Sequence, residues 1–174
     1  MEQVILVDEQ DRQVGVMEKM EAHEKALLHR AFSVFIFKSN GEMLLQQRAI
    51  SKYHSGGLWT NACCSHPRSN EETIAAAKRR LKEEMGFDTT LEKVFDFTYK
   101  AVFDNGLTEH EFDHVFVGTY NGVIDANEKE VHAFEYKSME LIKAELESKN
   151  DHYTAWFHIA FPKVYQWWKG SYCC

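Results

Sequence analysis

Residues 69–86 read SNEETIAAAKRRLKEEMG, and their spacing predicts a helix that begins at about Asn70 and ends at Gly86. Ser69 stands three residues before Glu72, so both side chains can cap free backbone amides where the helix starts. Four apolar residues recur at helical spacing and are expected to face the core: Ile74, Ala77, Leu81 and Met85.

The polar flank of this helix carries opposite charges. At about 100° per residue, Arg80 and Glu84 lie on one flank of the apolar stripe, whereas Glu83 points away from it. Shortly before the helix, Cys64 and His66 stand two residues apart and combine a polarizable thiol with an imidazole that can bind metal. These groups can therefore converge on one cleft.

Alternating apolar residues predict strands upstream of the helix. Two hairpins are expected there, with strands at 4–7 and 14–17, and at 33–38 and 43–47. The second turn contains Asn40-Gly41, a pair that supplies the positive φ angles of a tight turn.

Downstream, a third strand pair is expected at 94–103 and 109–120. Because side chains alternate along a strand, three carboxylates share one face of the second strand: Glu109, Glu111 and Asp113. A two-residue turn at Asn105-Gly106 would place Tyr99 on the face opposite Glu111. A turn of odd length, or a bulge, would bring Tyr99 and Glu111 to the same face.

Two more helices are expected near the C-terminus. Residues 138–149 form the first, capped by Ser138, and residues 162–169 form the second, with Pro162 in its first turn. Without repeats or linkers, residues 1–174 are predicted to form a single α/β (α+β) domain, in which helices sandwich mixed β-sheets.

The composition, 44% apolar and 27% charged, is typical of a soluble protein. The N-terminal residues lack the basic and apolar regions of a secretory signal, so we expect a cytoplasmic location and no membrane partner. A net charge of −7 disfavours nucleic-acid binding, and a monomer acting on a small molecule is expected. The Cys63-Cys64 and Cys173-Cys174 pairs are expected to be reduced thiols, and residues near 170–174 an unstructured tail.

The helix segment resembles the Nudix box, in which an Arg-Glu pair precedes two glutamates and a glycine. The residues that match this pattern in register are Glu71, Arg79, Leu81, Glu83, Glu84 and Gly86. Arg80 replaces a glutamate of the pattern, and Ser65 replaces its first glycine. Loss of a carboxylate that gathers metal at a diphosphate argues against a standard Nudix hydrolase.

With this departure, the chain resembles type I isopentenyl-diphosphate isomerases from about Lys19 to Trp156. The residues that carry the resemblance are Trp59-Thr60-Asn61, Cys64, His66, Glu109-His110-Glu111, His23 and His29. The resemblance implies that the chain interconverts isopentenyl diphosphate and dimethylallyl diphosphate. Such a site needs an acid on one face of the substrate, a base on the other and shelter for a tertiary carbocation between them.

The resemblance also implies the catalytic groups. Cys64 would exchange a proton at C2 of the substrate, and Glu111 or Tyr99 would deliver one to C4. The sequence leaves the division between Glu111 and Tyr99 open. Trp156 would place its ring over the developing cation. Outside the motif, Cys64, Tyr99 and Trp156 would each be interpreted as ordinary core residues.

The implied metal site combines three imidazoles and two carboxylates: His23, His29, His66, Glu109 and Glu111. Mn²⁺ or Mg²⁺ is expected there, with Zn²⁺ as a tight adventitious occupant. Glu84 would hold a second Mg²⁺ that bridges phosphate oxygens. The residues implied to bind the diphosphate are Lys19, Arg48, Ser51, Lys52 and Arg80.

Three other functions fit parts of the sequence less well. A Nudix diphosphate hydrolase is weakened by Arg80 and leaves the motif cysteine unexplained. A zinc-stabilised binding module could use Cys63, Cys64 and His66, but adjacent cysteines lack the usual ligand spacing. A cysteine acyl hydrolase needs a base and an orienting group that nothing in the sequence singles out.

Overall fold

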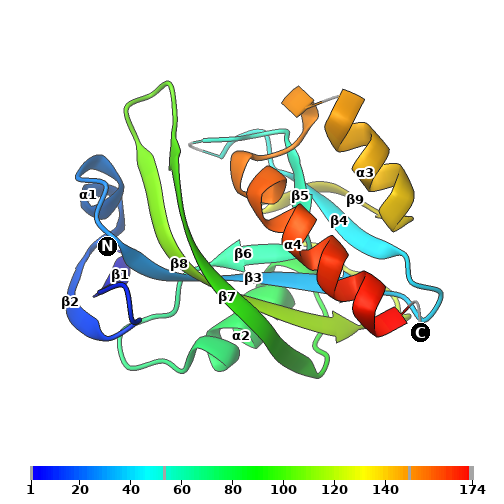
Figure 1. The fold of residues 1–174 in the computed structure, drawn as a ribbon, viewed down its shortest axis with the longest axis horizontal. Helices are drawn as coiled ribbons and strands as arrows, with labels where there is room; N and C mark the ends of the chain where they lie inside the picture. The colour runs from blue at the N-terminus through cyan, green and yellow to red at the C-terminus, as the bar shows by residue number, and fades with distance from the viewer. Residues whose placement is uncertain (1, 53, 149, 173–174) are drawn as a thin grey trace.

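The computed structural model describes residues 2–52, 54–148 and 150–172. The elements of secondary structure follow the chain (Figure 1) in the order β1 (Gln3–Val7), β2 (Gln13–Glu18), α1 (Lys19–Glu24), β3 (His29–Phe37), β4 (Met43–Arg48), β5 (Trp59–Asn61), β6 (Cys63–Ser65), α2 (Thr73–Met85), β7 (Leu91–Val102), β8 (Thr108–Thr119), β9 (Val131–Lys137), α3 (Met139–Ser148), the 3₁₀ turn η1 (Asn150–His152) and α4 (Ala155–Tyr172). Within these ranges, no helix is both long and apolar enough to cross a membrane.

Strand β3 is the centre of a mixed sheet. It pairs antiparallel with β1, β4 and β6, and parallel with β8, which pairs in turn with β7. Strand β2 extends the sheet through β1, while β5 and β9 extend it through β4. In the parallel pair, His29 lies opposite Glu111. The topology therefore sets two side chains that can bind metal beside each other on neighbouring strands.

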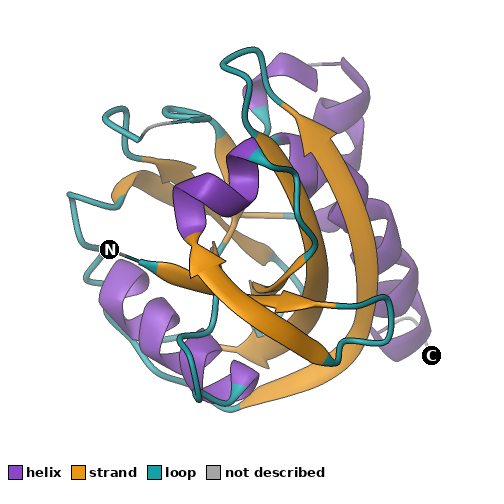
Figure 2. Ribbon diagram, turned by 90° about the vertical axis from the view of Figure 1, so that its left-hand side faces the viewer, coloured by secondary structure: helices purple, strands orange, loops and turns teal. Residues whose placement is uncertain are grey.

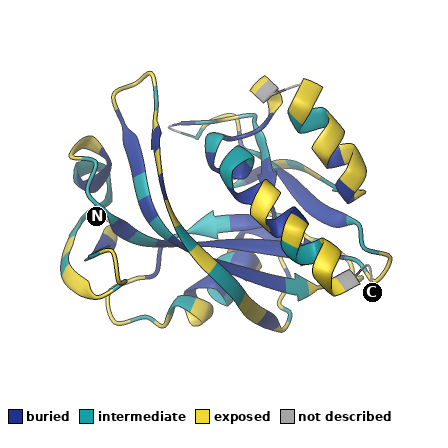
Figure 3. Ribbon diagram, viewed as in Figure 1, coloured by how far each residue is buried: buried dark blue, intermediate teal, exposed yellow. Residues whose placement is uncertain are grey.

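Helices cover both faces of this sheet, as Figure 2 shows. Helix α2 packs on one face, where Leu81 joins a buried cluster with Val34 of β3. Helix α4 packs on the other face, where Phe157 joins a cluster with Phe35. Because side chains alternate along β3, one strand supplies both cores. The predicted α/β architecture is confirmed, with a buried sheet and exposed outer helix faces (Figure 3).

The predicted N-terminal hairpins are also confirmed as β1–β2 and β3–β4. In the turn of the second hairpin Gly41 has φ 85°, as predicted, but Asn40 is not among the residues with positive φ and the connection spans residues 38–42, so no two-residue Asn-Gly turn forms. Helix α1 and strands β5, β6 and β9 were not predicted. Strands β5 and β6 have three residues each, too few to display a hydrophobic period.

The predicted start of the central helix is wrong by three residues. Helix α2 begins at Thr73 after an N-cap at Glu72, whose side chain makes no capping hydrogen bond in the described structure. Instead, Glu71 accepts two hydrogen bonds from Arg79, at 2.7 and 2.8 Å. The late start also affects Ile74, which lies in the first turn and is 40% exposed rather than buried. The predicted end at Gly86 is confirmed.

Helix α3, predicted over residues 138–149, is confirmed over Met139–Ser148, and Ser138 Oγ accepts a hydrogen bond from the Leu141 amide at 3.3 Å. The predicted last residue, Lys149, lies outside the described residues. The start of the last helix was predicted wrongly. Helix α4 begins at Ala155, and Pro162 lies inside it. The buried aromatic residues before the proline pack on the core, and this packing outweighs the cost of proline in a helix. Because α4 reaches Tyr172, only Cys173 and Cys174 are left for the expected tail, and they lie outside the described residues.

The pairing of β7 with β8 shows whether Tyr99 and Glu111 lie on the same face of the sheet. Val102 lies opposite Thr108, so the connection 103–107 is odd in length and no two-residue turn forms at Asn105-Gly106. Tyr99 therefore lies directly opposite Glu111, on the same face of the sheet.

Candidate active site

A cavity of about 840 Å³ opens at the end of the sheet where α1, β6 and β8 approach α2 and α4. Among the residues that line it are all those expected to contact a substrate: Lys19, Arg48, Ser51, Lys52, Arg80 and Trp156. Cys64, Tyr99 and Glu111 line the same cavity. The expected catalytic groups and the expected binding groups therefore share one space.

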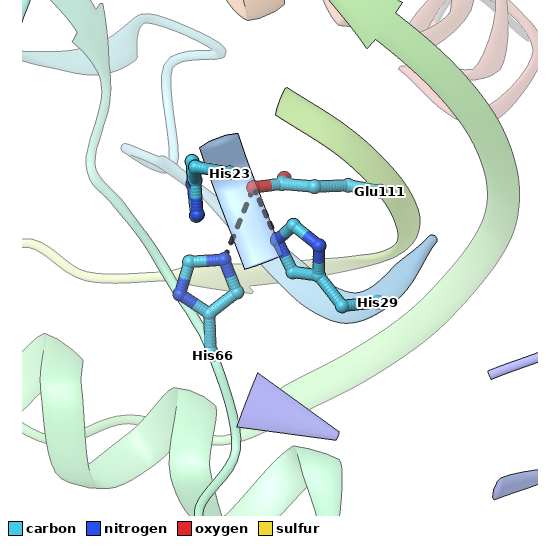
Figure 4. Close-up of side chains that lie close together, drawn as sticks. All are labelled: His23, His29, His66 and Glu111. Carbon is cyan, nitrogen blue, oxygen red and sulfur yellow. Dashed lines mark hydrogen bonds and ion pairs between the residues drawn. The ribbon is translucent and has the colours of Figure 1, made fainter. Parts of the chain in front are cut away.

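Four buried side chains meet beside this cavity (Figure 4). One donor atom from each of His23, His29, His66 and Glu111 lies within 4.8 Å of the others. Glu111 Oε1 is 3.0 Å from His66 Nε2 and 3.6 Å from His29 Nε2. The four residues come from α1, β3, the segment after β6, and β8. Long-range folding thus creates the group.

The hydrogen bonds of two imidazoles leave one ring nitrogen of each available to a metal. The Nδ1 atom of His23 donates to the Lys19 carbonyl at 2.7 Å, and the Nδ1 atom of His29 donates to the Leu27 carbonyl at 2.8 Å. In neutral rings, these bonds leave a lone pair on each Nε2. Burial lowers the pKa of His23, and burial also lowers the pKa of His66 to about 4. The rings of His23 and His66 are therefore neutral near pH 7, and neutral imidazole is the form that binds metal.

The carboxylate of the group is suited to the same purpose. Burial opposes ionisation of Glu111, but the neighbouring imidazoles of His29 and His66, the latter within hydrogen-bond distance at 3.0 Å, hold its pKa well below the usual range. An ionised carboxylate among neutral imidazoles is a donor set for a divalent metal ion. His23, His29, His66 and Glu111 therefore fit such an ion.

Glu109, the other carboxylate expected at the metal, has a different position. It is absent from the four-residue group, within the part of the chain that the structure describes. Its Oε2 atom is 3.0 Å from the Tyr99 hydroxyl, and its Oε1 atom is 3.6 Å from His54 Nε2. Burial and the charge of Glu111 raise the pKa of Glu109 well above the usual range. The structure thus places Glu109 in a hydrogen-bonded layer beside the metal donors.

Tyr99 connects the two carboxylates. Its hydroxyl donates to Glu111 Oε2 at 2.7 Å and lies beside Glu109. Burial and the charges of Glu109 and Glu111 raise the pKa of Tyr99, so its phenol keeps its proton. A protonated phenol against an ionised carboxylate can supply a proton to the cavity.

Cys64 and Glu111 belong to strands that flank β3. Cys64 on β6 pairs with Ser33, while Glu111 on β8 pairs with His29 of the same central strand. Burial raises the pKa of the Cys64 thiol. Cys63 is fully buried in the core beside α2 and does not line the cavity. The structure therefore gives the two adjacent cysteines different environments.

The four cationic side chains expected to bind phosphate, Lys19, Arg48, Lys52 and Arg80, each have a partner within the described residues. Arg80 donates to Glu84 Oε1 at 2.6 Å, and Glu84 Oε2 accepts a hydrogen bond from Gln46 at 2.9 Å. Lys52 pairs with Glu130. As the helical spacing predicted, Arg80 and Glu84 line the cavity, whereas Glu83 does not.

An aromatic wall closes the cavity near α4. The Arg48 guanidinium lies 5.0 Å from the centre of the Trp156 ring. His54 stacks on Phe103 at 4.9 Å and meets Trp156 edge-on at 5.9 Å. Burial lowers the pKa of His54 to about 3, so this ring is neutral. The wall therefore combines two aromatic rings and a neutral imidazole with the Arg48 guanidinium.

The polar residues in or beside the cavity that the sequence did not identify include Gln46, His54 and Glu130. Gln46 carried a detectable signal, because it follows Leu44 and Leu45 in a buried strand where a polar side chain needs a partner. His54 and Glu130 lie in irregular segments, and only the folded chain brings them to the site.

Comparison with known proteins gives consistent results. The sequence profile of the NUDIX domain matches residues 27–157. The chain is 49% identical over 168 residues to the isopentenyl-diphosphate Delta-isomerase of Pectobacterium atrosepticum, covering 97% of this chain and 94% of that protein. It is 47% identical to isopentenyl-diphosphate Delta-isomerase 2 of Aromatoleum aromaticum, covering 94% of this chain and 86% of that protein.

Solved structures show the same fold at low identity. A crystal structure from Deinococcus radiodurans superposes with a TM-score of 0.79 at 18% identity, covering 94% of this chain and 99% of that one. The MutT protein of Methanosarcina mazei Go1 superposes with a TM-score of 0.66 at 17% identity, covering 80% and 94%.

Proposed function

We propose a catalytic or binding role for each residue of the cavity, starting from the family of the chain. The chain belongs to the isopentenyl-diphosphate Delta-isomerase family and carries the NUDIX domain. Its reaction is the interconversion of isopentenyl diphosphate and dimethylallyl diphosphate. The observation that carries the division of tasks is the shared cavity, in which Cys64 and the Tyr99–Glu111 pair face one space.

The proposed chemistry is proton addition at C4 and proton removal at C2. An unactivated alkene is a weak base, so the acid must be held close to the carbon and sheltered from water. Tyr99, hydrogen-bonded to Glu111, delivers its proton to C4 and regains one from solvent, and Cys64 in its thiolate form accepts the proton released from C2 and becomes a thiol. In the reverse reaction, the same groups exchange their acid and base roles.

The four-residue group is proposed to hold Mn²⁺ or Mg²⁺, with Zn²⁺ as an alternative occupant. A bound divalent ion would withdraw electron density from Glu111 and favour its ionised form. The raised pKa of Tyr99 then keeps a proton on its phenol beside the ionised Glu111. Glu109 hydrogen-bonds the same phenol and completes the carboxylate pair around it.

The diphosphate is proposed to lie between α2 and the loop after β4. Arg80, Lys52 and Arg48 approach from these elements, and Ser51 lies nearby. Lys19 approaches the same cavity from α1. Glu84 would hold a second ion, Mg²⁺, against the phosphate oxygens. Because Arg80 stands where a hydrolytic carboxylate would be needed, this end of the cavity binds the diphosphate without activating water.

Trp156 is proposed to stabilise the cationic carbon. An indole face attracts positive charge by about 2 kcal/mol or more once water is removed. The Arg48 guanidinium lies 5.0 Å from the centre of this ring, which supports a favourable interaction between the ring and a cation. His54 and Phe103 form the dry wall beside it. Exclusion of water prevents hydration of the carbocation to an alcohol.

We also infer that the protein acts as a monomer in the cytoplasm, without a nucleic-acid partner. Its net charge of −7 supports the last of these points, because nonspecific nucleic-acid binding needs clustered cations.

A labelling experiment tests the proposal. The protein is incubated with isopentenyl diphosphate and Mg²⁺ in deuterated water, and product and deuterium at C2 and C4 are followed by NMR. Dimethylallyl diphosphate with deuterium at both carbons is expected. Release of phosphate without isomerisation would instead indicate a diphosphate hydrolase.

A further inference from the structure

Glu130 lies inside the cavity between two cations that come from different elements. Its Oε2 atom pairs with the Lys52 ammonium, and the same oxygen is 3.6 Å from Arg80 Nη2. All three side chains are partly buried: Lys52 and Glu130 are 23% exposed and Arg80 is 21% exposed. Water therefore screens these charges only in part. Partial burial opposes ionisation, but Lys52 lowers the pKa of Glu130, so the carboxylate is charged at neutral pH.

The backbone fixes this carboxylate in place. The Glu130 carbonyl accepts a hydrogen bond from the Ala49 amide at 2.9 Å, and the Glu130 amide donates to the Asn127 carbonyl at 2.9 Å. Asn127 in turn donates to the Glu84 carbonyl at 2.8 Å, near the end of α2. The segment is thus tied to both elements that carry the cations. Glu130 is positioned by the fold between Lys52 and Arg80.

An anionic group at this point opposes the binding of a diphosphate. Phosphate oxygens that approach Lys52 and Arg80 must take these cations over from Glu130. The diphosphate itself is unchanged by movement of the double bond. Its contacts therefore bind substrate, transition state and product almost equally, and such uniform binding does not raise the rate of the chemical step. Excess affinity for the diphosphate would instead slow product release.

We infer that Glu130 is an internal counter-ion that competes with the substrate diphosphate for Lys52 and Arg80. It holds these two cations in place in the empty cavity, and it limits the affinity of the cavity for the product. The inference rests on the proposed function, because it needs the diphosphate to bind these two cations. It assigns a task to a residue that neither transfers a proton nor belongs to the four-residue metal group.

Calorimetric titration with inorganic pyrophosphate and Mg²⁺ tests the inference on the full chain. Glu130→Gln keeps the shape of the side chain and removes its charge, so pyrophosphate should bind about three- to tenfold more tightly, the size of one partly buried charged contact. In steady-state assays, the KM for isopentenyl diphosphate should fall by a similar factor, and kcat should not rise. Glu128→Gln is the matched control, because Glu128 is exposed, lies two residues upstream and does not line the cavity.

Unchanged or weaker pyrophosphate binding in Glu130→Gln would overturn the inference. Weaker binding would indicate that the carboxylate helps to hold the Mg²⁺ of the complex. A rise in kcat would also overturn it, by placing Glu130 in the chemical step. If Glu130→Gln is recovered unfolded, Glu130→Asp withdraws the carboxylate by one methylene, and tightening should still be seen.

Arg80→Met separates this inference from the proposed function. The proposed function requires Arg80→Met to lose pyrophosphate affinity while its thermal unfolding curve remains cooperative. Unaltered pyrophosphate binding in that variant would refute the proposed diphosphate site itself. Lost binding in Arg80→Met, together with unaltered binding in Glu130→Gln, would refute only the role inferred for Glu130.

Discussion

Replacing Tyr99 with phenylalanine tests the arrangement of acid groups most directly. The Tyr99 side chain is 7% exposed, and its hydroxyl lies 2.7 Å from Glu111 and 3.0 Å from Glu109. A hydrogen bond to a charged group contributes about 1.5–3 kcal/mol. Since 1.36 kcal/mol corresponds to a factor of ten, kcat should fall by about 10- to 150-fold if the phenol only holds Glu111 in place. If the phenol itself donates the proton, loss of a general acid can reduce kcat by about 10²–10⁴-fold.

The assay measures formation of dimethylallyl diphosphate and entry of deuterium at C2 and C4 in deuterated water. With dimethylallyl diphosphate as the substrate, exchange at C4 should slow more than exchange at C2 in Tyr99→Phe, because Cys64 can protonate C2 of this alkene and remove a proton from it again without Tyr99. Tyr165→Phe is the control: Tyr165 is also 7% exposed and donates to Glu140 at 2.6 Å, but it lies outside the cavity. A fall in kcat smaller than about threefold in Tyr99→Phe, or an equal fall in Tyr165→Phe, would refute the reasoning.

Three other predictions use the same cavity and its surroundings. Cys64→Ala should abolish isomerisation while leaving the metal content measured by mass spectrometry unchanged; retained turnover would exclude Cys64 as the group that exchanges a proton at C2. His66→Ala should lower the metal content, and normal metal content in this variant would contradict the proposed donor set. The control His114→Gln should leave the metal content unchanged, because buried His114 lies on the other face of β8 and contacts Asp11 at 2.9 Å. Burial lowers the pKa of His114 in the folded chain, whereas the pKa of a histidine in the unfolded chain is about 6.5. Below that pH the unfolded chain therefore binds a proton at His114 that the folded chain does not, and the free energy of unfolding falls as the pH decreases. His114→Gln should therefore show a shallower loss of stability between about pH 7 and pH 5 in urea titrations, and identical slopes would disprove this contribution.

Local patterns predicted the fold well where period and turn chemistry agreed. Asn40-Gly41 located a hairpin, and Leu81 and Gly86 located the buried face and the end of α2. The patterns were misleading where tertiary packing overrode a local signal. Ser69 satisfies the capping pattern, but Glu71 bonds Arg79 instead, and the helix starts later.

The candidate site was predicted as a set of residues, whereas its geometry required the fold. The resemblance named His23, His29, His66 and Glu111, and the structure brings these four together. The resemblance could not predict the hydrogen-bond partners of Glu109, because alternation along a strand indicates the face on which a side chain lies but not the neighbour that it contacts. The face shared by Tyr99 and Glu111 depended on the length of one turn, which the sequence left open.

The four proposed metal donors come from segments that are far apart in the chain, and this spacing would link binding of the ion to the maturation of the protein. No short stretch holds all four donors, so an unfolded chain would bind the ion only weakly, and the completed fold would gain nearly all of the binding free energy. At an ion concentration 100-fold above Kd, that gain is about 2.7 kcal/mol, a sizeable share of the stability of an ordinary domain. Metal scarcity during synthesis should then shorten the lifetime of the newly made chain against proteases, in addition to leaving it inactive.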